Sequence, residues 1–194
     1  KPKLKGRILD TTPIIPPHRF AHAVLRTQDI DRAIAWYGRV LGAHVVQRSE
    51  FLAFLTYDEE HHRVALVATP QRAPAPPGAA GLDHLAYTHK DLGTLLATYA
   101  RLKKEGIEPF WTVNHGPTTS MYYRDPDGNG VELQVDNFPT EEELKAWMKS
   151  DHFADNQIGV EFDADRLLEL YTRGDPVEAL QKQGVAGSSA RPKF

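Results

Sequence analysis

Apolar and polar positions change their period several times between residues 18 and 69. Residues 19–26 alternate as in a β-strand. From Ile30 to Leu41 the apolar residues recur at spacings of three and four, the period of an amphipathic helix, and Gly42 follows as its terminator. Three more strand-like runs follow this helix, at residues 43–48, 51–57 and 63–69. The pattern predicts a βαβββ module.

The same pattern returns after a Pro- and Ala-rich stretch at residues 70–81, which we interpret as a linker. When the sequence is aligned with itself after a shift of 62 positions, His22 coincides with His84 without a gap. The polar and apolar positions of the two predicted helices coincide in the same alignment. Three strand-like runs again follow the second helix. We therefore predict an α+β fold in which two βαβββ modules, residues 18–69 and 82–136, form an open mixed β-barrel around a metal site.

The remaining segments lie outside the two modules. Residues 1–17 end in a Pro-rich stretch and are expected to be extended, because proline restricts both itself and its predecessor. Thr140 followed by Glu143 has the form of a helix cap, and Asp163 precedes a second helix at about residues 164–172. We expect one domain at residues 18–138, and a C-terminal helical strap with a flexible tail from Gln183 at residues 139–194.

Composition restricts the classes of function. The chain has 194 residues with 23 basic and 26 acidic side chains, so no dense basic stripe is available to bind nucleic acid. No apolar stretch approaches the about 20 residues that span a bilayer, and the N-terminus lacks a signal-peptide core. The absence of cysteine excludes disulfides. We expect a soluble cytoplasmic protein without nucleic-acid or membrane partners.

Candidate metal ligands occupy repeat-related strand positions. His22 and His84 coincide in the first strands of the two modules, and in the last strands Glu132 corresponds to Ala65. A carboxylate among strand apolars is costly to bury unless a cation or partner compensates it. Two imidazoles and one carboxylate form the facial triad of non-haem Fe(II) oxygenases. Two modules folded about a pseudo-twofold axis would bring these three donors together.

The sequence resembles the vicinal oxygen chelate superfamily, which includes glyoxalases, bleomycin resistance proteins and dioxygenases. Within it, the chain resembles the single-domain type I extradiol catechol dioxygenases. The superfamily likeness rests on the two modules and on Phe20-Ala21-His22, Gly81-Leu82-Asp83-His84 and Tyr123-Arg-Asp-Pro-Asp-Gly-Asn-Gly-Val-Glu132. The narrower likeness rests on His61-His62-Arg63, Asn114-His115-Gly116 and Ser120-Met121-Tyr122.

The resemblance implies a metal cofactor and a reaction. Fe(II), with Mn(II) as the less favoured metal, would be held by His22, His84 and Glu132. A catecholic substrate and O2 are the expected partners. Both oxygen atoms would enter the substrate, and the ring would open beside the diol to give a muconic semialdehyde type of product.

The resemblance also implies roles for three other side chains. His62 would take a proton from the catechol and later return it, since imidazole has a pKa near neutrality. His115 and Tyr122 would donate hydrogen bonds to substrate oxygens and to developing negative charge. Because strand faces alternate, we predict that His61 points away from His62, and Tyr123 away from Tyr122.

Alternatives stay open. A glyoxalase- or epimerase-like isomerase or lyase would use a fourth ligand where this chain has Ala65. A non-catalytic module that sequesters small molecules would not need the three donors together. A zinc hydrolase could use two histidines and one glutamate, but no H-E-x-x-H helix is present. Exposed edge strands favour a homo-oligomer in each case.

Overall fold

The structure is a computed structural model that describes residues 14, 16–73, 76 and 79–187. Most of the predicted N-terminal segment, part of the predicted linker and residues 188–194 of the predicted tail lie outside the described residues. No helix in the described part of the chain combines the length and apolar character that crossing a bilayer requires.

The first module contains one helix and four strands: β1 (Ala23–Thr27), α1 (Ile30–Leu41), β2 (His44–Arg48), β3 (Leu52–Thr56) and β4 (Val64–Ala68). The strand order is β1-β4-β3-β2, with β1 parallel to β4 and the other pairs antiparallel. The Asp29 side chain accepts a hydrogen bond from the Arg32 amide at the start of α1, and Gly42 ends the helix at φ 67°. The predicted order of elements is confirmed.

The second module repeats this plan with β5 (His84–Thr88), α2 (Leu92–Lys104), β6 (Trp111–Asn114), β7 (Thr118–Arg124) and β8 (Gly130–Asp136). Its sheet has the order β5-β8-β7-β6-β9, with β5 parallel to β8. Val24 lies opposite Ala65 in the first sheet, and Ala86 lies opposite Glu132 in the second. The predicted correspondence of Ala65 with Glu132 is therefore confirmed by the strand register.

A single hydrophobic core joins the two modules. It contains the inward residues of both sheets and the apolar stripes of α1 and α2, and the two helices contact each other. Within this core the Tyr37 hydroxyl on α1 donates a hydrogen bond to Asp125 in the turn before β8. At the surface, the Arg101 guanidinium on α2 donates to the carbonyl of Arg39 at 2.7 Å. The modules are thus held together through the helix-bearing sides of their sheets.

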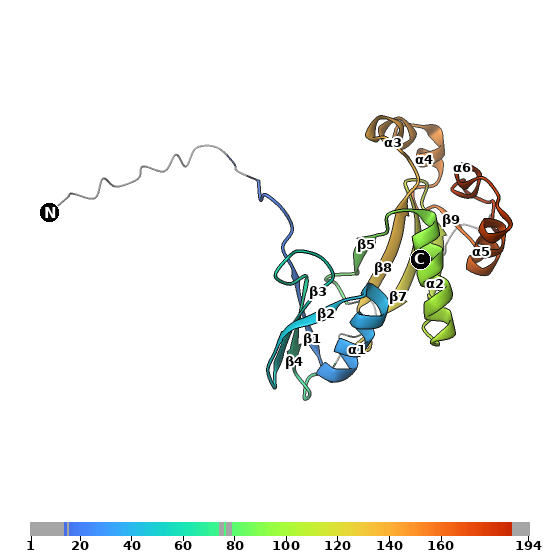
Figure 1. The fold of residues 1–194 in the computed structure, drawn as a ribbon. Coiled ribbons are helices and arrows are strands. Elements are labelled where there is room, and N and C mark those ends of the chain that lie inside the picture. The colour runs from blue at the N-terminus through green and yellow to red at the C-terminus, as the bar shows by residue number, and fades with distance from the viewer. Residues whose placement is uncertain (1–13, 15, 74–75, 77–78, 188–194) are drawn as a thin grey trace.

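The two sheets remain separate layers. No strand of one sheet pairs with a strand of the other among the described residues, and β1 and β5 are the end strands of their sheets. Figure 1 shows the sheets splayed apart, with α1 beside the first and α2 beside the second. The mixed α+β class and the two modules are confirmed, but one chain does not wrap its strands around a common centre.

The C-terminal strap covers the far edge of the second sheet. It consists of α3 (Glu141–Met148), α4 (Asp151–Asp155), β9 (Val160–Glu161), α5 (Ala164–Arg173) and α6 (Val177–Leu180). Thr140 and Asp163 cap α3 and α5 as predicted. The short strand β9 pairs with β6, which local periodicity did not indicate. The expectation of little order from Gln183 is wrong as far as Ala186, because Ala186 is buried and its carbonyl accepts from the Asp163 amide.

Candidate active site

His84 and Glu132 meet on one face of the second sheet. Val131 and Leu133, on either side of Glu132, point into the core that contains α2, so alternation places Glu132 on the opposite face. His84 Nε2 lies 3.0 Å from Glu132 Oε2. The Glu132 side chain is only 6% exposed, and a carboxylate buried to this degree requires a partner of positive or proton-donating character.

The orientation of the His84 ring is set by its neighbour in sequence. Nδ1 of His84 lies 2.7 Å from Oδ2 of Asp83. A carboxylate on one ring nitrogen fixes the tautomer and aims the other nitrogen, an arrangement common behind metal-bound histidines. Sequence reasoning did not assign Asp83 a role, although the Asp-His dipeptide was visible as a signal.

Tyr122 lies directly opposite Glu132 in the pairing of β7 with β8. Its ring packs edge-on against His84 with centroids 5.1 Å apart and stacks on Trp111 at 4.7 Å. Burial, followed by the negative charge of Glu132, raises the pKa of the Tyr122 phenol above its ordinary value. The hydroxyl therefore stays protonated and able to donate. Tyr123 points into the core, as predicted.

His115 is positioned by the C-terminal strap. Its Nδ1 contacts the backbone carbonyl of Ile158, just before β9, and its Nε2 lies 2.9 Å from the Tyr122 hydroxyl. Since a carbonyl can only accept, we assign the proton to Nδ1, which leaves Nε2 as the acceptor for Tyr122. Burial lowers the pKa of His115, opposed by the Ile158 hydrogen bond, so the ring is neutral near pH 7. Nothing in the sequence pattern pointed to Ile158.

A second group of histidines lies on the first sheet. The rings of His22 and His62 have centroids 4.2 Å apart, and His62 stacks on Phe54 at 4.4 Å. Nδ1 of His61 lies 2.6 Å from Nδ1 of His62, so the prediction that these two rings point apart is wrong. Both residues precede β4, which begins at Val64, and strand alternation does not yet apply to them. Burial, then the neighbouring His22 and His61, lowers the pKa of His62.

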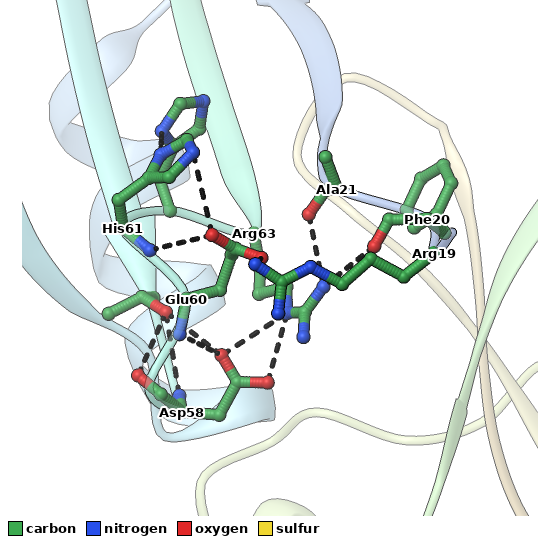
Figure 2. Close-up of polar contacts among 9 residues, drawn as sticks. Arg19, Phe20, Ala21, Asp58, Glu60, His61 and Arg63 are labelled. Atoms are coloured by element: carbon green, nitrogen blue, oxygen red, sulfur yellow. Dashed lines mark hydrogen bonds and ion pairs between the residues drawn. The ribbon is translucent and has the colours of Figure 1, made fainter. Parts of the chain in front are cut away.

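Arg63 holds the segment that precedes His22 close to the turn that precedes His61 and His62 (Figure 2). Its guanidinium donates to the carbonyls of Phe20 and Ala21, at 2.9 and 3.1 Å, immediately before His22. The same guanidinium donates to Asp58 Oδ2 at 2.9 Å, in the turn that leads to His62. One side chain therefore holds the start of β1 beside the start of β4.

Glu60 forms a further link in this cluster (Figure 2). Its side chain is 5% exposed, with Oε2 3.0 Å from Arg19 Nη2 and Oε1 accepting from the His61 amide at 3.1 Å. The hydrogen bond from the His61 amide is the main cause that lowers the pKa of Glu60. Burial acts in the opposite direction, and the positive charge of Arg19 lowers the pKa further. The carboxylate is thus ionised and restrains the turn that carries His61.

The predicted site residues fall into two groups within one chain. His84, Glu132, Tyr122 and His115 lie together on the second sheet, whereas His22 and His62 lie together on the first. Among the described residues, no group of three His, Cys, Asp or Glu side chains is placed to hold a metal ion. Nδ1 of His22 is buried without a hydrogen-bond partner. The sequence predicted candidate donors on both sheets, but it did not predict that they would lie in two separate groups.

Comparison with known proteins places this arrangement in a family. Residues 19–133 match the Glyoxalase/Bleomycin resistance protein/Dioxygenase superfamily. Biphenyl-2,3-diol 1,2-dioxygenase 2 of Rhodococcus globerulus is 48% identical over 163 residues, which cover 84% of this chain and 86% of that protein. Biphenyl-2,3-diol 1,2-dioxygenase 3 of the same organism is 47% identical over 173 residues, covering 87% and 90%.

Solved structures agree on the fold. The glyoxylase/bleomycin resistance protein/dioxygenase domain from Frankia sp. EAN1pec aligns with a TM-score of 0.54 at 19% identity, over 66% of this chain and 99% of that one. The likeness of folds and the identity to the two Rhodococcus enzymes lead to one assignment. The chain belongs to the Glyoxalase/Bleomycin resistance protein/Dioxygenase superfamily and, within it, to the extradiol dioxygenases.

Proposed function

We propose that this dioxygenase uses Fe(II), held by His22, His84 and Glu132, to cleave the aromatic ring of a catechol beside its diol. The observation that carries the proposal is the buried Glu132 carboxylate, 3.0 Å from His84 Nε2. Two donors about 2.1 Å from one ion and at right angles to it lie about 3 Å apart, so this pair is spaced as two adjacent ligands. The buried, unpartnered Nδ1 of His22 supports it as a third donor.

The relatives support a particular substrate class. Two enzymes that align with more than four-fifths of this chain are named for biphenyl-2,3-diol, a catechol with an aryl group beside one hydroxyl. Their 1,2-cleavage breaks the bond between the aryl-bearing carbon and the adjacent hydroxyl-bearing carbon. We infer the same class of substrate and the same bond for this chain. The stacked rings of Trp111 and Tyr122 offer an apolar wall for such a substrate.

The chain's own residues handle the protons. A diol that binds through both oxygens loses a proton, and the lowered pKa of His62 leaves its imidazole neutral and able to accept that proton near pH 7. In the free protein the Tyr122 hydroxyl donates its one proton to His115 Nε2, and on substrate binding it would turn to donate that proton to a substrate oxygen instead. When bound, the metal would supply a template for the diol and a path for electron density to O2. Catechol and O2 together balance the product, so no external reductant is needed.

The test is reconstitution of the protein with Fe(II) under anaerobic conditions, followed by 2,3-dihydroxybiphenyl and then air. The expected result is a yellow semialdehyde absorbance that grows with one O2 consumed per substrate. The Glu132→Ala variant, treated identically, serves as the control for adventitious iron. Conversion of a glutathione hemithioacetal without O2 uptake, and no ring cleavage with any catechol, would favour the isomerase alternative instead.

A further inference from the structure

The short strand β9 is the part of the C-terminal strap that reaches the proposed active site, because it pairs with β6. Glu161, the second residue of β9, accepts a hydrogen bond on Oε1 from the indole Nε1–H of Trp111 at 3.0 Å. Three residues earlier, the Ile158 carbonyl contacts the His115 ring. One stretch of the strap therefore holds two side chains whose rings both contact Tyr122.

The hydrogen bond to Glu161 controls the orientation of the Trp111 indole. The Trp111 ring stacks on Tyr122 with centroids 4.7 Å apart, and it meets His115 edge-on at 5.7 Å. Stacking alone allows a ring to slide within its own plane. The indole Nε1–H is a donor only, and a hydrogen bond from it to a carboxylate is stronger than one to a neutral acceptor. The half-buried Glu161 carboxylate thus fixes the position that stacking leaves adjustable.

Trp111 lies at a defined distance from the candidate metal ligand. In the strand register Trp111 is opposite Tyr122, and Tyr122 is opposite Glu132. Neighbouring strands are about 4.8 Å apart, so the Trp111 backbone is about 10 Å from that of Glu132 along this row of the sheet. A biphenyl diol bound beside Glu132 through its oxygens extends a second ring away from the diol, whereas catechol has no group beyond its one ring. The Trp111 indole is therefore available to the second ring.

We propose that Glu161 is a positioning residue that sets the preference of this enzyme for aryl-substituted catechols, by holding the Trp111 indole where the second ring of the substrate packs. This inference rests on the proposed function and deepens it. Aromatic side chains contribute a large contact area whose value depends on geometry. An indole released from Glu161 loses its contact with the aryl substituent, while the diol and its ring keep their own contacts. Loss of the carboxylate should therefore weaken the binding of aryl catechols selectively.

The deciding experiment compares Glu161→Ala with the wild type on 2,3-dihydroxybiphenyl and on unsubstituted catechol. We expect KM for 2,3-dihydroxybiphenyl to rise about 10-fold with kcat changed less than about threefold, because a binding contact is lost and no reacting group is removed. KM for catechol should stay within about twofold of the wild type. Glu161→Gln keeps an acceptor oxygen for the indole and should retain most of the preference. An equal rise of both KM values would overturn the proposal.

Thr112→Val is the matched control for a loosened strap. The Thr112 hydroxyl donates to the carbonyl of Phe162, the residue after Glu161, so this substitution also removes a hydrogen bond between the strap and β6. It leaves the indole N–H of Trp111 and its acceptor in place. We expect no change in the preference between the two diols. A loss of preference as large as that in Glu161→Ala would show that attachment of the strap in general is responsible, and would refute the specific role of Glu161.

A double-mutant cycle tests whether Glu161 acts through Trp111. Trp111→Phe keeps an aromatic ring but removes the N–H donor. In this background Glu161→Ala should cause no further rise in KM for 2,3-dihydroxybiphenyl, because the contact between the two residues is already absent. A further rise as large as that in the wild-type background would mean that the carboxylate acts by another route, and the proposal would fail. Circular dichroism of each variant verifies that the fold is retained.

Anaerobic binding measurements separate this inference from the proposed function. Isothermal titration calorimetry of the Fe(II)-loaded protein without O2 gives the dissociation constants of the same two diols without ring cleavage. A wild type that binds the diols but cleaves neither refutes the proposed function, while the effect of Glu161→Ala on the ratio of the dissociation constants still decides the role of Glu161. A wild type that cleaves both diols without preferring the aryl compound refutes this inference alone. A wild type that binds neither diol refutes both.

Discussion

The Tyr37 hydroxyl donates a hydrogen bond to Oδ2 of Asp125 at 2.9 Å, and both residues are buried. Tyr37 belongs to α1 of the first module, and Asp125 opens the turn between β7 and β8 of the second. Asp125 also accepts from the amides of Asp127 and Asn129, at 2.9 and 2.8 Å, so the turn itself depends on the same carboxylate. This hydrogen bond therefore couples the packing of the modules to the turn that precedes the Glu132 strand.

Removing the Tyr37 hydroxyl should destabilise the protein. Tyr37→Phe removes one of the two donors to Asp125 Oδ2 and leaves only the Asn129 side-chain amide, at 2.8 Å. Because the lost hydrogen bond is buried and its acceptor is a carboxylate, we expect the free energy of unfolding to fall by about 1–3 kcal/mol. Urea denaturation followed by circular dichroism measures the change. Tyr57→Phe is the matched control, because Tyr57 is 42% exposed and should change the stability by less than about 0.5 kcal/mol. Equal effects of the two substitutions would contradict the assigned role.

Arg63 should matter for metal binding although it touches no candidate ligand directly. Arg63→Ala removes the donor that holds Phe20 and Ala21 beside the Asp58 turn, so His22 loses its fixed position. We expect Fe(II) affinity to fall by about 10- to 100-fold, the usual effect of losing a group that orients a ligand. Competition with a chelator measures it. Arg63→Lys keeps the positive charge but lacks the several N–H donors of the guanidinium. Full Fe(II) affinity in Arg63→Lys would show that the charge, and not the hydrogen bonds to Phe20, Ala21 and Asp58, is what matters.

A substitution at Gly159 tests the contact between His115 and the Ile158 carbonyl of the C-terminal strap. Its φ is +113°, and an added Cβ would lie 2.3 Å from the Asn114 carbonyl oxygen and 2.6 Å from the His115 Cα. Gly159→Ala should displace Ile158, release the His115 ring and lower kcat by at least about 10-fold, with a smaller change in KM.

Gly174→Ala provides the control for this substitution. Gly174 also has a positive φ, +95°, but an added Cβ there would meet no atom within 4 Å. We expect Gly174→Ala to cost stability, on the order of 1 kcal/mol, without changing kcat. A similar loss of kcat in both variants would show that backbone strain, and not the His115 contact, is responsible.

His62 should affect turnover and not iron content. His62→Gln keeps a polar side chain of similar size but cannot cycle a proton near neutrality. We expect kcat to fall by about 10²- to 10⁴-fold with iron retained. Metal analysis alongside steady-state kinetics separates the two effects. Loss of iron from this variant would instead identify His62 as a ligand.

Stability should decline as the solution becomes acidic. Burial lowers the pKa of His89 below its ordinary value, opposed by the charge of Asp91, and burial also lowers the pKa of His115. The unfolded chain therefore takes up protons first as the pH falls through about 6.5, and the free energy of unfolding drops from there downwards. Urea unfolding at pH 5 to 8 measures this slope, and His89→Asn should reduce it. An unchanged slope would exclude His89 as a contributor.

Local patterns in the sequence determined the elements and the repeat. The spacing of apolar residues set α1 and α2, Asp29 and Gly42 set the ends of α1, and alternation set the side of the sheet on which Glu132 lies. These features depend on residues within a few positions of one another. They can therefore be read from a single chain without knowing what packs against it.

Tertiary structure decided how these elements are combined. Alternation places Glu132 on a particular face of its sheet, but it contains no information on the distance between that face and His22 beside the other sheet. That distance is set by packing between α1 and α2 and by contacts such as Tyr37 with Asp125, which are 88 positions apart. The same holds for Ile158, whose carbonyl reaches His115 only because β9 pairs with β6. Such contacts depend on the free energy of burying whole surfaces, which no local pattern records.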